Sequence, residues 1–505
     1  MPWISRKVVY WFGQDPSPDD RREFANRGLT LRHSLTTDAL FNLDVACAAV
    51  FSGKPPHVNY VCERLGLAKQ ALDAGLMVCL LADDAPTQAH LEKHLPSSLH
   101  SRLQSAVLRK TGAVAPYSLP QSILTHDPGP AANRTLDIAL TPGIELNQDE
   151  RFLLMRAFTD SRRIVLRRLS GGLSANTFFV QATLTFSEAG PRPMPFFVKL
   201  DEPTTIAREL FNYEAYATQH IPWNLRPNVD SRRCLIGVER GILVGSFVDR
   251  SESLWAVAQK GDGARYIHSL FENTLMGWRG HADRIDTKRG TLATKLDGIF
   301  RYEDVHPMYV EAARQRGIDE TPKAIWEHLL DLRDQAWREG IMHGDMHGEN
   351  VRVRDSDAIV IDLEKTRANG PLSADLASLD VWLSFKVPVA SPLPARDVWT
   401  AVVDDLYAPK AVREMPATES VDVGLDWLRA CIRQTRMISA ASCKCATEYA
   451  TTVAVYLLRR ATRLPDLLED GERSAEDQYR RGYAYYLGAK LVQALSTESK
   501  GTPVA

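Results

Sequence analysis

The chain has 505 residues, enough for two or three domains, and its 44% hydrophobic and 25% charged residues are ordinary for a globular protein. A formal net charge of -2 gives no reason to expect nucleic acid or an anionic membrane as a partner. No apolar run approaches the ~20 residues of a membrane-spanning helix, and we expect no signal peptide. Seven scattered cysteines without short, regular spacings favour a reduced, cytoplasmic compartment.

The first 112 residues show the alternation of an α/β domain. Apolar runs at 7–14, 44–53 and 76–83 alternate with segments of helical spacing, for example 58–75. Strands that alternate with helices predict a doubly wound parallel sheet with helices on both faces. We therefore expect residues 1–112 to form a separate α/β domain.

This domain resembles a response-regulator receiver but departs from that family at the phosphorylation site. Its third apolar strand ends at Phe51-Ser52-Gly53, where a receiver would present its phosphoacceptor aspartate. Asp15 near the first strand and Lys110 after the last could stand for the remaining pieces of a receiver site. The resemblance implies a degenerate receiver, and the alternative is an α/β interaction module that carries no phosphate. Either form could dock a protein partner.

Residues 113–145 are expected to be a linker, because five prolines interrupt any periodicity there. A helix is predicted from about Asn147. Three strands follow within Ile164–Leu200, and two shorter ones within Arg233–Val248. Residues 146–248 are therefore predicted to be a strand-rich segment.

Two features of these strands could contact phosphate. Gly171 and Gly172, in a turn that also contains Ser174, have no Cβ, so backbone amides there can approach an anion closely. An ordinary hairpin turn contains the same residues. Lys199 lies inside the apolar strand FFVKL, where an ammonium is costly unless it finds an anion. The alternative is an edge-strand lysine whose ammonium reaches solvent.

Residues 249–495 are predicted to be largely helical. One helix is expected from Pro322 to Gly340. Further helices are expected over residues 373–385, 395–406, 421–438, 449–458 and 475–495. Residues 496–505 are expected to be a disordered tail.

The most informative stretch is Ile341–Asp362, IMHGDMHGENVRVRDSDAIVID. Phosphoryl transfer needs fixed acceptor oxygens around magnesium and a base beside the nucleophile. Asp345 would accept the proton of an attacking hydroxyl. Asn350, five residues on, and Asp362, which follows the strand AIVI, would hold the metal. An ordinary loop aspartate at position 345 is the alternative, but it does not explain the spacing of the other two.

The pattern H-G-D-x-x-x-x-N followed by I-D resembles the aminoglycoside phosphotransferase/choline kinase-like branch of the protein-kinase-like fold. Within that branch, LRRLSGGLSANTFFV resembles a bacterial subgroup of ternary-complex-associated domains. The resemblance covers roughly Leu146 to Leu495. It implies an α+β two-lobed kinase-like domain, with an N-terminal lobe at 146–248 and a helical C-terminal lobe at 249–495, that uses ATP and Mg²⁺.

The resemblance also implies roles for residues outside the central motif. Lys199 would orient the α- and β-phosphates and would be held by Glu214, with Glu209 as the second choice. The amides near Gly171 and Gly172 would cover the phosphates. The segment that contains Ser246 and Val248 would be the hinge whose backbone contacts adenine.

Other positions bear on the substrate and on structural support. Gly344 replaces the arginine that couples the catalytic loop of most protein kinases to a phosphorylated activation segment. His347 replaces a protein-kinase lysine, and little chain separates Asp362 from Asp375. These departures favour a small-molecule acceptor. His343 and Asp375 are expected to support the loop structurally.

The sequence therefore predicts an ATP-dependent phosphotransferase that acts on a hydroxyl of a small molecule. One alternative is a nucleotide-binding pseudokinase that serves as a signalling scaffold. Another is an atypical protein kinase whose partner docks on residues 1–112.

Overall fold

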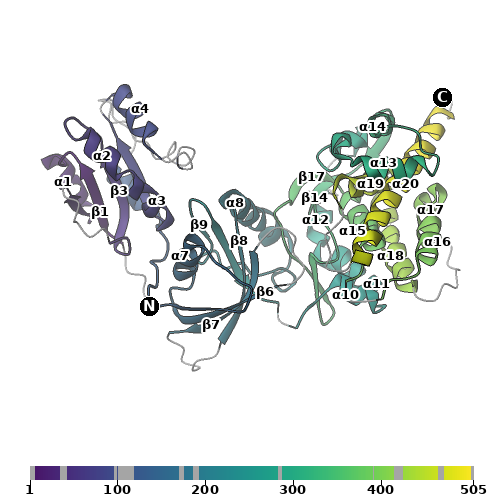
Figure 1. The fold of residues 1–505 in the computed structure, drawn as a ribbon, viewed down its shortest axis with the longest axis horizontal. Helices are drawn as coiled ribbons and strands as arrows, with labels where there is room; N and C mark the ends of the chain where they lie inside the picture. The colour runs from purple at the N-terminus through teal and green to yellow at the C-terminus, as the bar shows by residue number, and fades with distance from the viewer. Residues whose placement is uncertain are drawn as a thin grey trace. The chain divides into compact units, whose positions relative to one another are not determined.

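The computed structural model describes residues 6–34, 42–82, 84–95, 99, 119–169, 176–185, 193–248, 250–282, 287–389, 392–414, 425–464 and 471–501 (Figure 1). The chain divides into two compact units. Unit 1 comprises Met1–Leu210 and Asn228–Phe247, and unit 2 comprises Phe211–Pro227 and Val248–Ala505.

Unit 1 begins with a four-stranded parallel sheet in the order β2-β1-β3-β4. Its strands are β1 (Val8–Gly13), β2 (Thr30–Ser34), β3 (Ala46–Ser52) and β4 (Met77–Leu81). The helices are α1 (Pro18–Asn26), α2 (Val58–Arg64), α3 (Gly66–Asp73) and α4 (Ala85–Lys93). Alternate residues of β1 enter two different apolar clusters, Tyr10 and Phe12 in one, Val9 and Trp11 in the other. Both faces of the sheet are therefore buried, as the sequence predicts for a doubly wound domain.

The receiver resemblance stays a prediction, since a parallel α/β sheet is common to many folds. Asp15 forms an ion pair with Arg21, and its carboxylate lies 3.0 Å from Nδ1 of His33. Lys110 lies outside the described residues. The helix predicted over 58–75 is divided into α2 and α3 at Leu65.

A second sheet of unit 1 has six strands in the order β5-β6-β7-β8-β10-β9. They are β5 (Asp137–Leu140), β6 (Ser161–Arg168), β7 (Asn176–Leu184), β8 (Pro193–Asp201), β10 (Gly241–Ser246) and β9 (Leu235–Ile236). Helix α7 (Gln148–Ala157) begins at an Asn147 capping box, and its Leu153 and Leu154 pack into the core with Val180 and Val198. The five strands predicted between residues 164 and 248 are confirmed.

The predicted linker is partly folded. Within residues 113–145 the structure contains helix α6 (Leu119–Thr125) and strand β5. Strand β5 pairs in parallel with β6, from Asp137 opposite Arg163 to Leu140 opposite Leu166. Pro120 lies in the first turn of α6, where a proline is tolerated, and Pro128, Pro130 and Pro142 lie outside both elements. Composition alone therefore suggested an unstructured segment.

Arg156 connects the two sheets of unit 1. Its side chain is buried and donates to three backbone carbonyls: Pro130 O at 3.0 Å, Pro128 O at 2.7 Å, and Asp73 O at the end of α3. Burial lowers the pKa of Arg156 to about 9, so the guanidinium is still charged at neutral pH. The Asp73 carboxylate adds a hydrogen bond of 2.7 Å from the Val238 amide. The α/β domain is therefore fastened to the second sheet by buried polar contacts.

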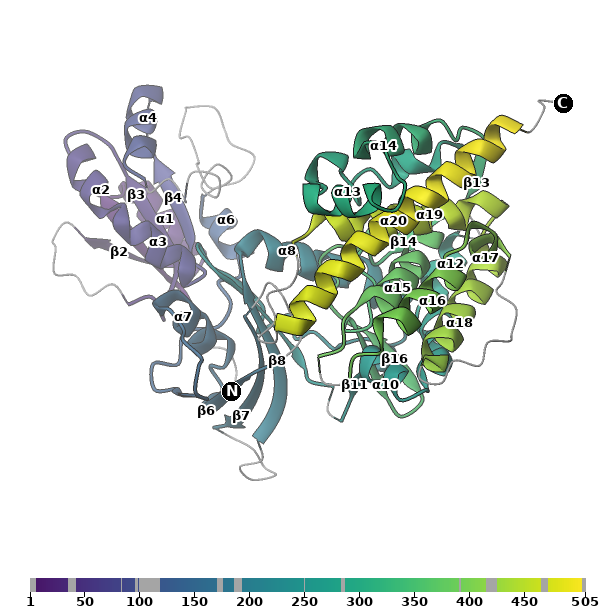
Figure 2. The ribbon, with the colours of Figure 1, turned by 45° about the vertical axis from the view of Figure 1, so that its right-hand side comes forward.

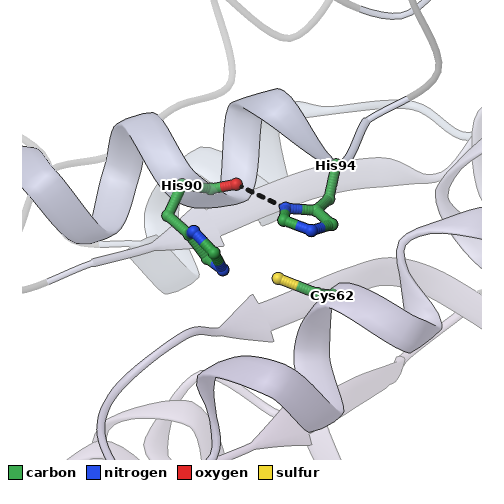
Figure 3. Close-up of side chains that lie close together, drawn as sticks. All are labelled: Cys62, His90 and His94. Carbon is green, nitrogen blue, oxygen red and sulfur yellow. Dashed lines mark hydrogen bonds between the residues drawn. The ribbon is translucent and has the colours of Figure 1, made fainter.

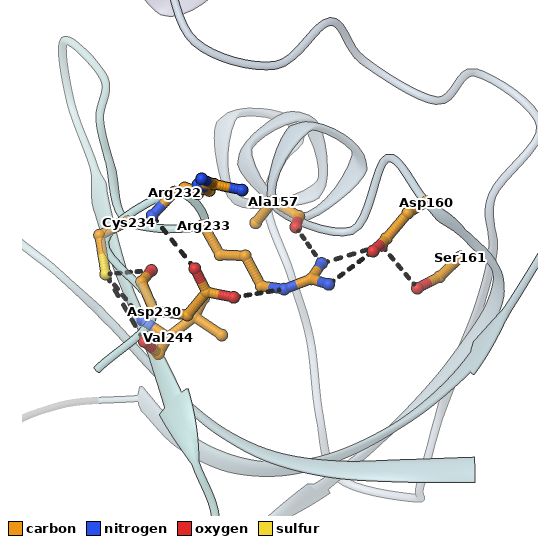
Figure 4. Close-up of polar contacts among 8 residues, drawn as sticks. All are labelled: Ala157, Asp160, Ser161, Asp230, Arg232, Arg233, Cys234 and Val244. Carbon is orange, nitrogen blue, oxygen red and sulfur yellow. Dashed lines mark hydrogen bonds and ion pairs between the residues drawn. The ribbon is translucent and has the colours of Figure 1, made fainter. Parts of the chain in front are cut away.

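A second arginine fixes the corner between α7 and β6. Arg233 donates to Ala157 O and to both carboxylate oxygens of Asp160, at 2.9 and 2.6 Å (Figure 4). Its Nε donates to Asp230 at 3.0 Å, and the guanidinium lies over the ring of Phe158. The fork of donors thereby joins the turn before β9 to the end of α7.

Unit 2 is mainly helical and also contains a small sheet in the order β11-β15-β16, formed by β11 (Glu252–Ser253), β15 (Val351–Arg354) and β16 (Asp357–Val360). Its longer helices include α15 (Ser373–Phe385), α16 (Arg396–Leu406), α18 (Asp426–Ser442), α19 (Ala446–Arg459) and α20 (Gly471–Gly501). Figure 2 shows α20 running beside α19 and α13 (Pro307–Arg314). The helices predicted over 373–385, 395–406, 449–458 and 475–495 are confirmed. Helix α18 confirms most of the helix predicted over 421–438, of which residues 421–424 lie outside the described residues. In the described part of the chain, no helix has the length and apolar character needed to cross a bilayer.

Two predicted boundaries in unit 2 are wrong. The helix expected over 322–340 is α14 (Pro322–Leu330), and β13 (Gln335–Trp337) and β14 (Glu339–Met342) follow it. Strand β14 pairs with β17 (Arg367–Pro371), and this pairing outweighs the helical spacing of the apolar residues in that segment. Helix α20 continues to Gly501, so residues 496–501 are helical, and residues 502–505 lie outside the described residues.

We expect Arg156→Met to lower the free energy of unfolding of unit 1 by roughly 2–4 kcal/mol, because three buried carbonyls lose a charged donor. Arg162→Met, at an exposed position of the neighbouring strand, is the matched control and should stay within about 0.5 kcal/mol of wild type. Urea denaturation would measure both variants. Equal midpoints for the two variants would contradict the role of Arg156.

Candidate active site

The central motif forms a strand, a loop and a hairpin within unit 2. After β14 the chain enters the loop that carries Asp345, and β15 (Val351–Arg354) then pairs antiparallel with β16 (Asp357–Val360). The pairing extends one step further, because the Ile361 amide donates to Asn350 O at 2.9 Å. Asn350 and Asp362 therefore lie at the same open end of the hairpin, although twelve positions separate them in the sequence.

The Asp375 carboxylate holds the backbone of the loop that carries Asp345. It accepts the amides of His343 at 2.7 Å and of Gly344 at 3.1 Å. Burial raises the pKa of Asp375, and these contacts oppose that effect. The His343 ring contacts Ile361 O through Nε2 at 2.9 Å. The structural roles expected for His343 and Asp375 are confirmed.

The candidate base, Asp345, lies between two cations. Lys365 Nζ is 2.6 Å from one carboxylate oxygen, and Arg459 Nη2 is 3.3 Å from the other. Burial alone would raise the pKa of Asp345, but Arg459 and Lys365 outweigh it and hold the pKa well below its usual range. Asp345 is therefore a carboxylate at any physiological pH. Such a group orients a hydroxyl strongly and accepts its proton only as the reaction proceeds.

Asn350 is buried, and its amide orientation follows from its contacts. Its Nδ2 donates to Asp345 O at 3.1 Å. Because the nitrogen is used on that carbonyl, the amide oxygen is left to face a cation. An amide oxygen and the Asp362 carboxylate at one end of a hairpin are ligands that Mg²⁺ accepts, together with water and phosphate oxygens. The two residues thus have the right chemistry for the expected metal.

Asp362 has a left-handed backbone conformation, with φ of 62°. Aspartate tolerates this region better than most residues, and such conformations concentrate at functional sites. Asn212 holds the chain just beyond it, since its Nδ2 donates to Leu363 O and Glu364 O, both at 2.9 Å. The direction of the Asp362 side chain is therefore set by contacts that hold the backbone on both sides.

His347 is packed as a neutral ring. Its imidazole stacks on Trp382, with ring centroids 5.3 Å apart and an interplanar angle of 17°. Burial lowers the pKa of His347 to about 4, more than the nearby Asp345 raises it. It does not replace the positive charge of the protein-kinase lysine, whereas Lys365 brings a positive charge to the same loop.

The lysine predicted to bind phosphate lies in unit 1, with a different partner from the one favoured by the sequence. Lys199 on β8 is buried and contacts Glu209 at 2.8 Å. Helix α8 (Pro203–Asn212) starts directly after β8, so that Glu209 shares its buried face with Ile206. Glu214 is exposed on the following turn of π-helix. The structure pairs Lys199 with Glu209, the second choice, and Glu214 as its partner stays a prediction.

The remaining predicted residues are only partly described. Gly171, Gly172 and Ser174 lie outside the described residues, although β6 and β7 on either side pair antiparallel as expected for a hairpin. Ser246 ends β10, and its amide donates to Asn228 O at 2.8 Å. Val248 O accepts the Ser251 hydroxyl at 2.7 Å. The boundary between the two units falls between Phe247 and Val248, within the predicted hinge.

Sequence reasoning missed three contributors, namely Lys365, Arg459 and Asn212. Lys365 follows Asp362 by three residues, and its charge so close to a motif aspartate was a usable signal. Arg459 reaches Asp345 from 114 positions away, at the end of α19. Asn212 lies 151 positions before the carbonyl that it holds. No local pattern marks either of these two.

Comparison with known protein families gives a match over the part of the chain that carries this motif. Residues 251–400, which include the whole loop and hairpin, match the model of the phosphotransferase enzyme family APH, a family of kinases. No curated protein sequence matches the chain at a significant level.

Solved structures show distant likeness only. A thermostable mutant of the aminoglycoside phosphotransferase APH(4)-Ia, in complex with AMP-PNP and hygromycin B, has 12% identity and a TM-score of 0.35; the match covers 67% of this chain and 94% of that one. Choline kinase from Cryptosporidium parvum Iowa II has 12% identity and a TM-score of 0.32 over 67% and 92% of the two chains. Glucosamine kinase has 14% identity and a TM-score of 0.32 over 67% and 84%. Likeness at this level identifies no substrate.

The backbone of this loop leaves little space for a side chain at Gly344. This glycine has φ of 78°, and an added Cβ would lie 2.5 Å from Lys365 O. Gly317 is the matched control, with φ of 89° and no heavy atom within 4 Å of its added Cβ. Both alanine variants bear the strain of the left-handed conformation, but only Gly344→Ala adds a clash. Gly344→Ala should lower the free energy of unfolding by roughly 1–3 kcal/mol more than Gly317→Ala in urea denaturation. Equal losses would show that the Lys365 backbone moves away freely.

Proposed function

We propose that the protein is an ATP-dependent phosphotransferase that transfers the γ-phosphoryl group of ATP to a hydroxyl of a small molecule. The observation that carries the proposal is the convergence in unit 2 of a carboxylate, an amide oxygen and a second carboxylate on one loop and hairpin. The Asn350 side chain holds the Asp345 carbonyl, and its backbone pairs beside Asp362. Phosphoryl transfer depends mainly on such fixed positions.

The chemistry assigned to the residues is simple. Asp345 orients the acceptor hydroxyl and takes its proton as the oxygen bonds to the γ-phosphorus and the bond to the β,γ-bridging oxygen breaks, which leaves ADP. Asn350 and Asp362 hold Mg²⁺, which when bound neutralises phosphate charge. Lys365, beside Asp345, adds a cation where negative charge moves during transfer.

In this proposal Lys199 of unit 1 binds the nucleotide. Lys199, held by Glu209, orients the α- and β-phosphates, and the amides near Gly171 and Gly172 cover them. Because the Ser246 amide is engaged with Asn228, the adenine contact falls to the backbone between Ser246 and Val248. The kinase-like lobes at 146–248 and 249–495 and the cytoplasmic location are part of the same proposal.

The surroundings of Asp345 restrict the acceptor. Both ionic partners that the structure gives this carboxylate are cations, Lys365 and Arg459. These two cations would compete with a polycationic acceptor such as an aminoglycoside for the Asp345 carboxylate. The acceptor proposed is therefore a neutral or anionic hydroxyl compound. Gly344 supports a small molecule, because its backbone leaves no room for the arginine through which protein kinases sense an activation segment.

The alternatives differ in where labelled phosphate goes. The protein would be incubated with γ-labelled ATP and a cell extract, and small molecules would be separated from proteins. Label in the small-molecule fraction supports the proposal, and label on a protein supports an atypical protein kinase that recruits its partner through residues 1–112. ATP binding with no labelled product in either fraction supports a pseudokinase scaffold.

Asp345→Asn should reduce phosphoryl transfer by roughly 10²–10⁴-fold, because the amide cannot accept the hydroxyl proton. ATP affinity should stay within about threefold, since Asp345 is assigned to the acceptor side. Asp334→Asn, an exposed loop position, is the control for the substitution itself. The label assay and ATP titration would measure both. Retained activity in Asp345→Asn would remove the base assignment.

Glu209→Gln and Glu214→Gln form a matched pair. Loss of the Glu209 carboxylate deprives buried Lys199 of its 2.8 Å partner and should lower kcat/KM for ATP roughly tenfold or more. Glu214 is exposed, so its variant should stay within about twofold of wild type. Steady-state kinetics with varied ATP would measure the difference. If the two variants behave in reverse, the pairing seen on α8 is not the one used with nucleotide.

A further inference from the structure

Three side chains with metal-binding atoms meet in the N-terminal α/β domain, and none of them belongs to the sites described above. Cys62 on α2 and His90 and His94 at the end of α4 each offer a ligand atom, and these atoms lie within 4.8 Å of one another. Figure 3 shows the Cys62 thiol pointing from its helix toward the two imidazole rings. The ring centroids of His90 and His94 are 4.6 Å apart.

The two helices hold these side chains in place. His90 and His94 are four residues apart, so they lie on one face of α4 and its C-cap. Asp84 caps the start of α4 by accepting the Thr87 amide at 2.7 Å. Between the histidines, Leu91 is fully buried and packs against Gly53 at the end of β3. The burial of Leu91 in the core therefore determines which face of α4 carries the histidines. The burial of Val61, the neighbour of Cys62, orients α2 in the same way.

One imidazole is already oriented for metal binding. His94 Nδ1 lies 2.8 Å from His90 O and donates its proton to that carbonyl in the neutral ring. Nε2 is then the nitrogen without a proton, which is the form that binds a metal. Metal-binding histidines commonly donate their other nitrogen to a backbone carbonyl in this way. Because both histidines are exposed, packing does not account for their meeting with the thiol.

The donor set indicates the kind of ion. One thiolate and two imidazoles suit borderline ions, Zn²⁺ above all, and do not suit Mg²⁺ or Ca²⁺. Tetrahedral zinc with its usual bond lengths separates such donors by roughly 3.3–3.6 Å. The three atoms need to approach by about an ångström, which side-chain rotations on two adjacent helices can supply.

We propose that Cys62, His90 and His94 form a Zn²⁺ site that fastens α4 to α2 in the N-terminal domain. Three protein ligands leave the fourth position to water or to a group of a docked partner. Binding replaces the proton of the Cys62 thiol, which is released to solvent. The site is independent of phosphoryl transfer, so neither proposal depends on the other.

The test uses the full-length chain, stripped of metal with a chelator. Zn²⁺ should bind with one ion per chain in calorimetry, and Co²⁺ should give a thiolate-to-metal charge-transfer band. Cys62→Ser and His94→Ala should each weaken Zn²⁺ affinity roughly a hundredfold or more, and Cys62→Ser should abolish the cobalt band. His268→Ala, which removes an exposed histidine from a helix of unit 2, should change neither.

A second measurement needs no variant and covers the case in which one fails to fold. Alkylation of wild-type protein, mapped by mass spectrometry, should show that Zn²⁺ protects Cys62 while the half-buried Cys234 reacts at an unchanged rate. Unprotected Cys62, or equal Zn²⁺ affinity in wild type and Cys62→Ser, would overturn the proposal.

Discussion

The buried carboxylate of Asp375 is the contact on which the candidate site depends. It accepts two consecutive amides, of His343 and Gly344, and so forces the chain to turn where β14 ends. Gly344 can follow that turn because it has no Cβ to meet Lys365 O. The turn presents Asp345, and the Asn350 side chain then fastens the Asp345 carbonyl to the hairpin. Burial of the Asp375 carboxylate would be costly without these two amides. Asp375 and the loop therefore stabilise one another.

The charged residues of the candidate site form different kinds of ion pair in the two units. In unit 1, Lys199 and Glu209 form a buried pair that turns a lysine inside an apolar strand into a fixed cation. In unit 2, the Asp345 carboxylate forms ion pairs with Lys365 and Arg459. These two cations hold the pKa of Asp345 below its usual range although burial opposes them.

The N-terminal domain is attached to the second sheet of unit 1 by packing as well as by buried polar contacts. Val238, from the turn before β10, joins the apolar cluster of the first sheet, and its amide donates to Asp73. Lys69 bridges Asp73 and Asp149 at 3.1 Å, and Arg156 crosses to the end of α3. Such contacts transmit a change in one part to the other more readily than a flexible tether does. An ion that joined α2 to α4 would act on this same domain.

The sequence by itself determined the parallel first sheet, the five strands between residues 164 and 248, including the one that carries Lys199, and the spacing of Asp345, Asn350 and Asp362 in the motif. These features rest on periodicity and short spacings, which are local properties of a chain. Only the tertiary structure decided that Glu209 is the partner of Lys199, since that choice depends on where α8 begins relative to β8 and on which face it buries. The tertiary structure also decided that Arg459 and Lys365 flank Asp345 and that β5 pairs with β6. Packing brings these groups together, and no spacing in the sequence encodes their contacts.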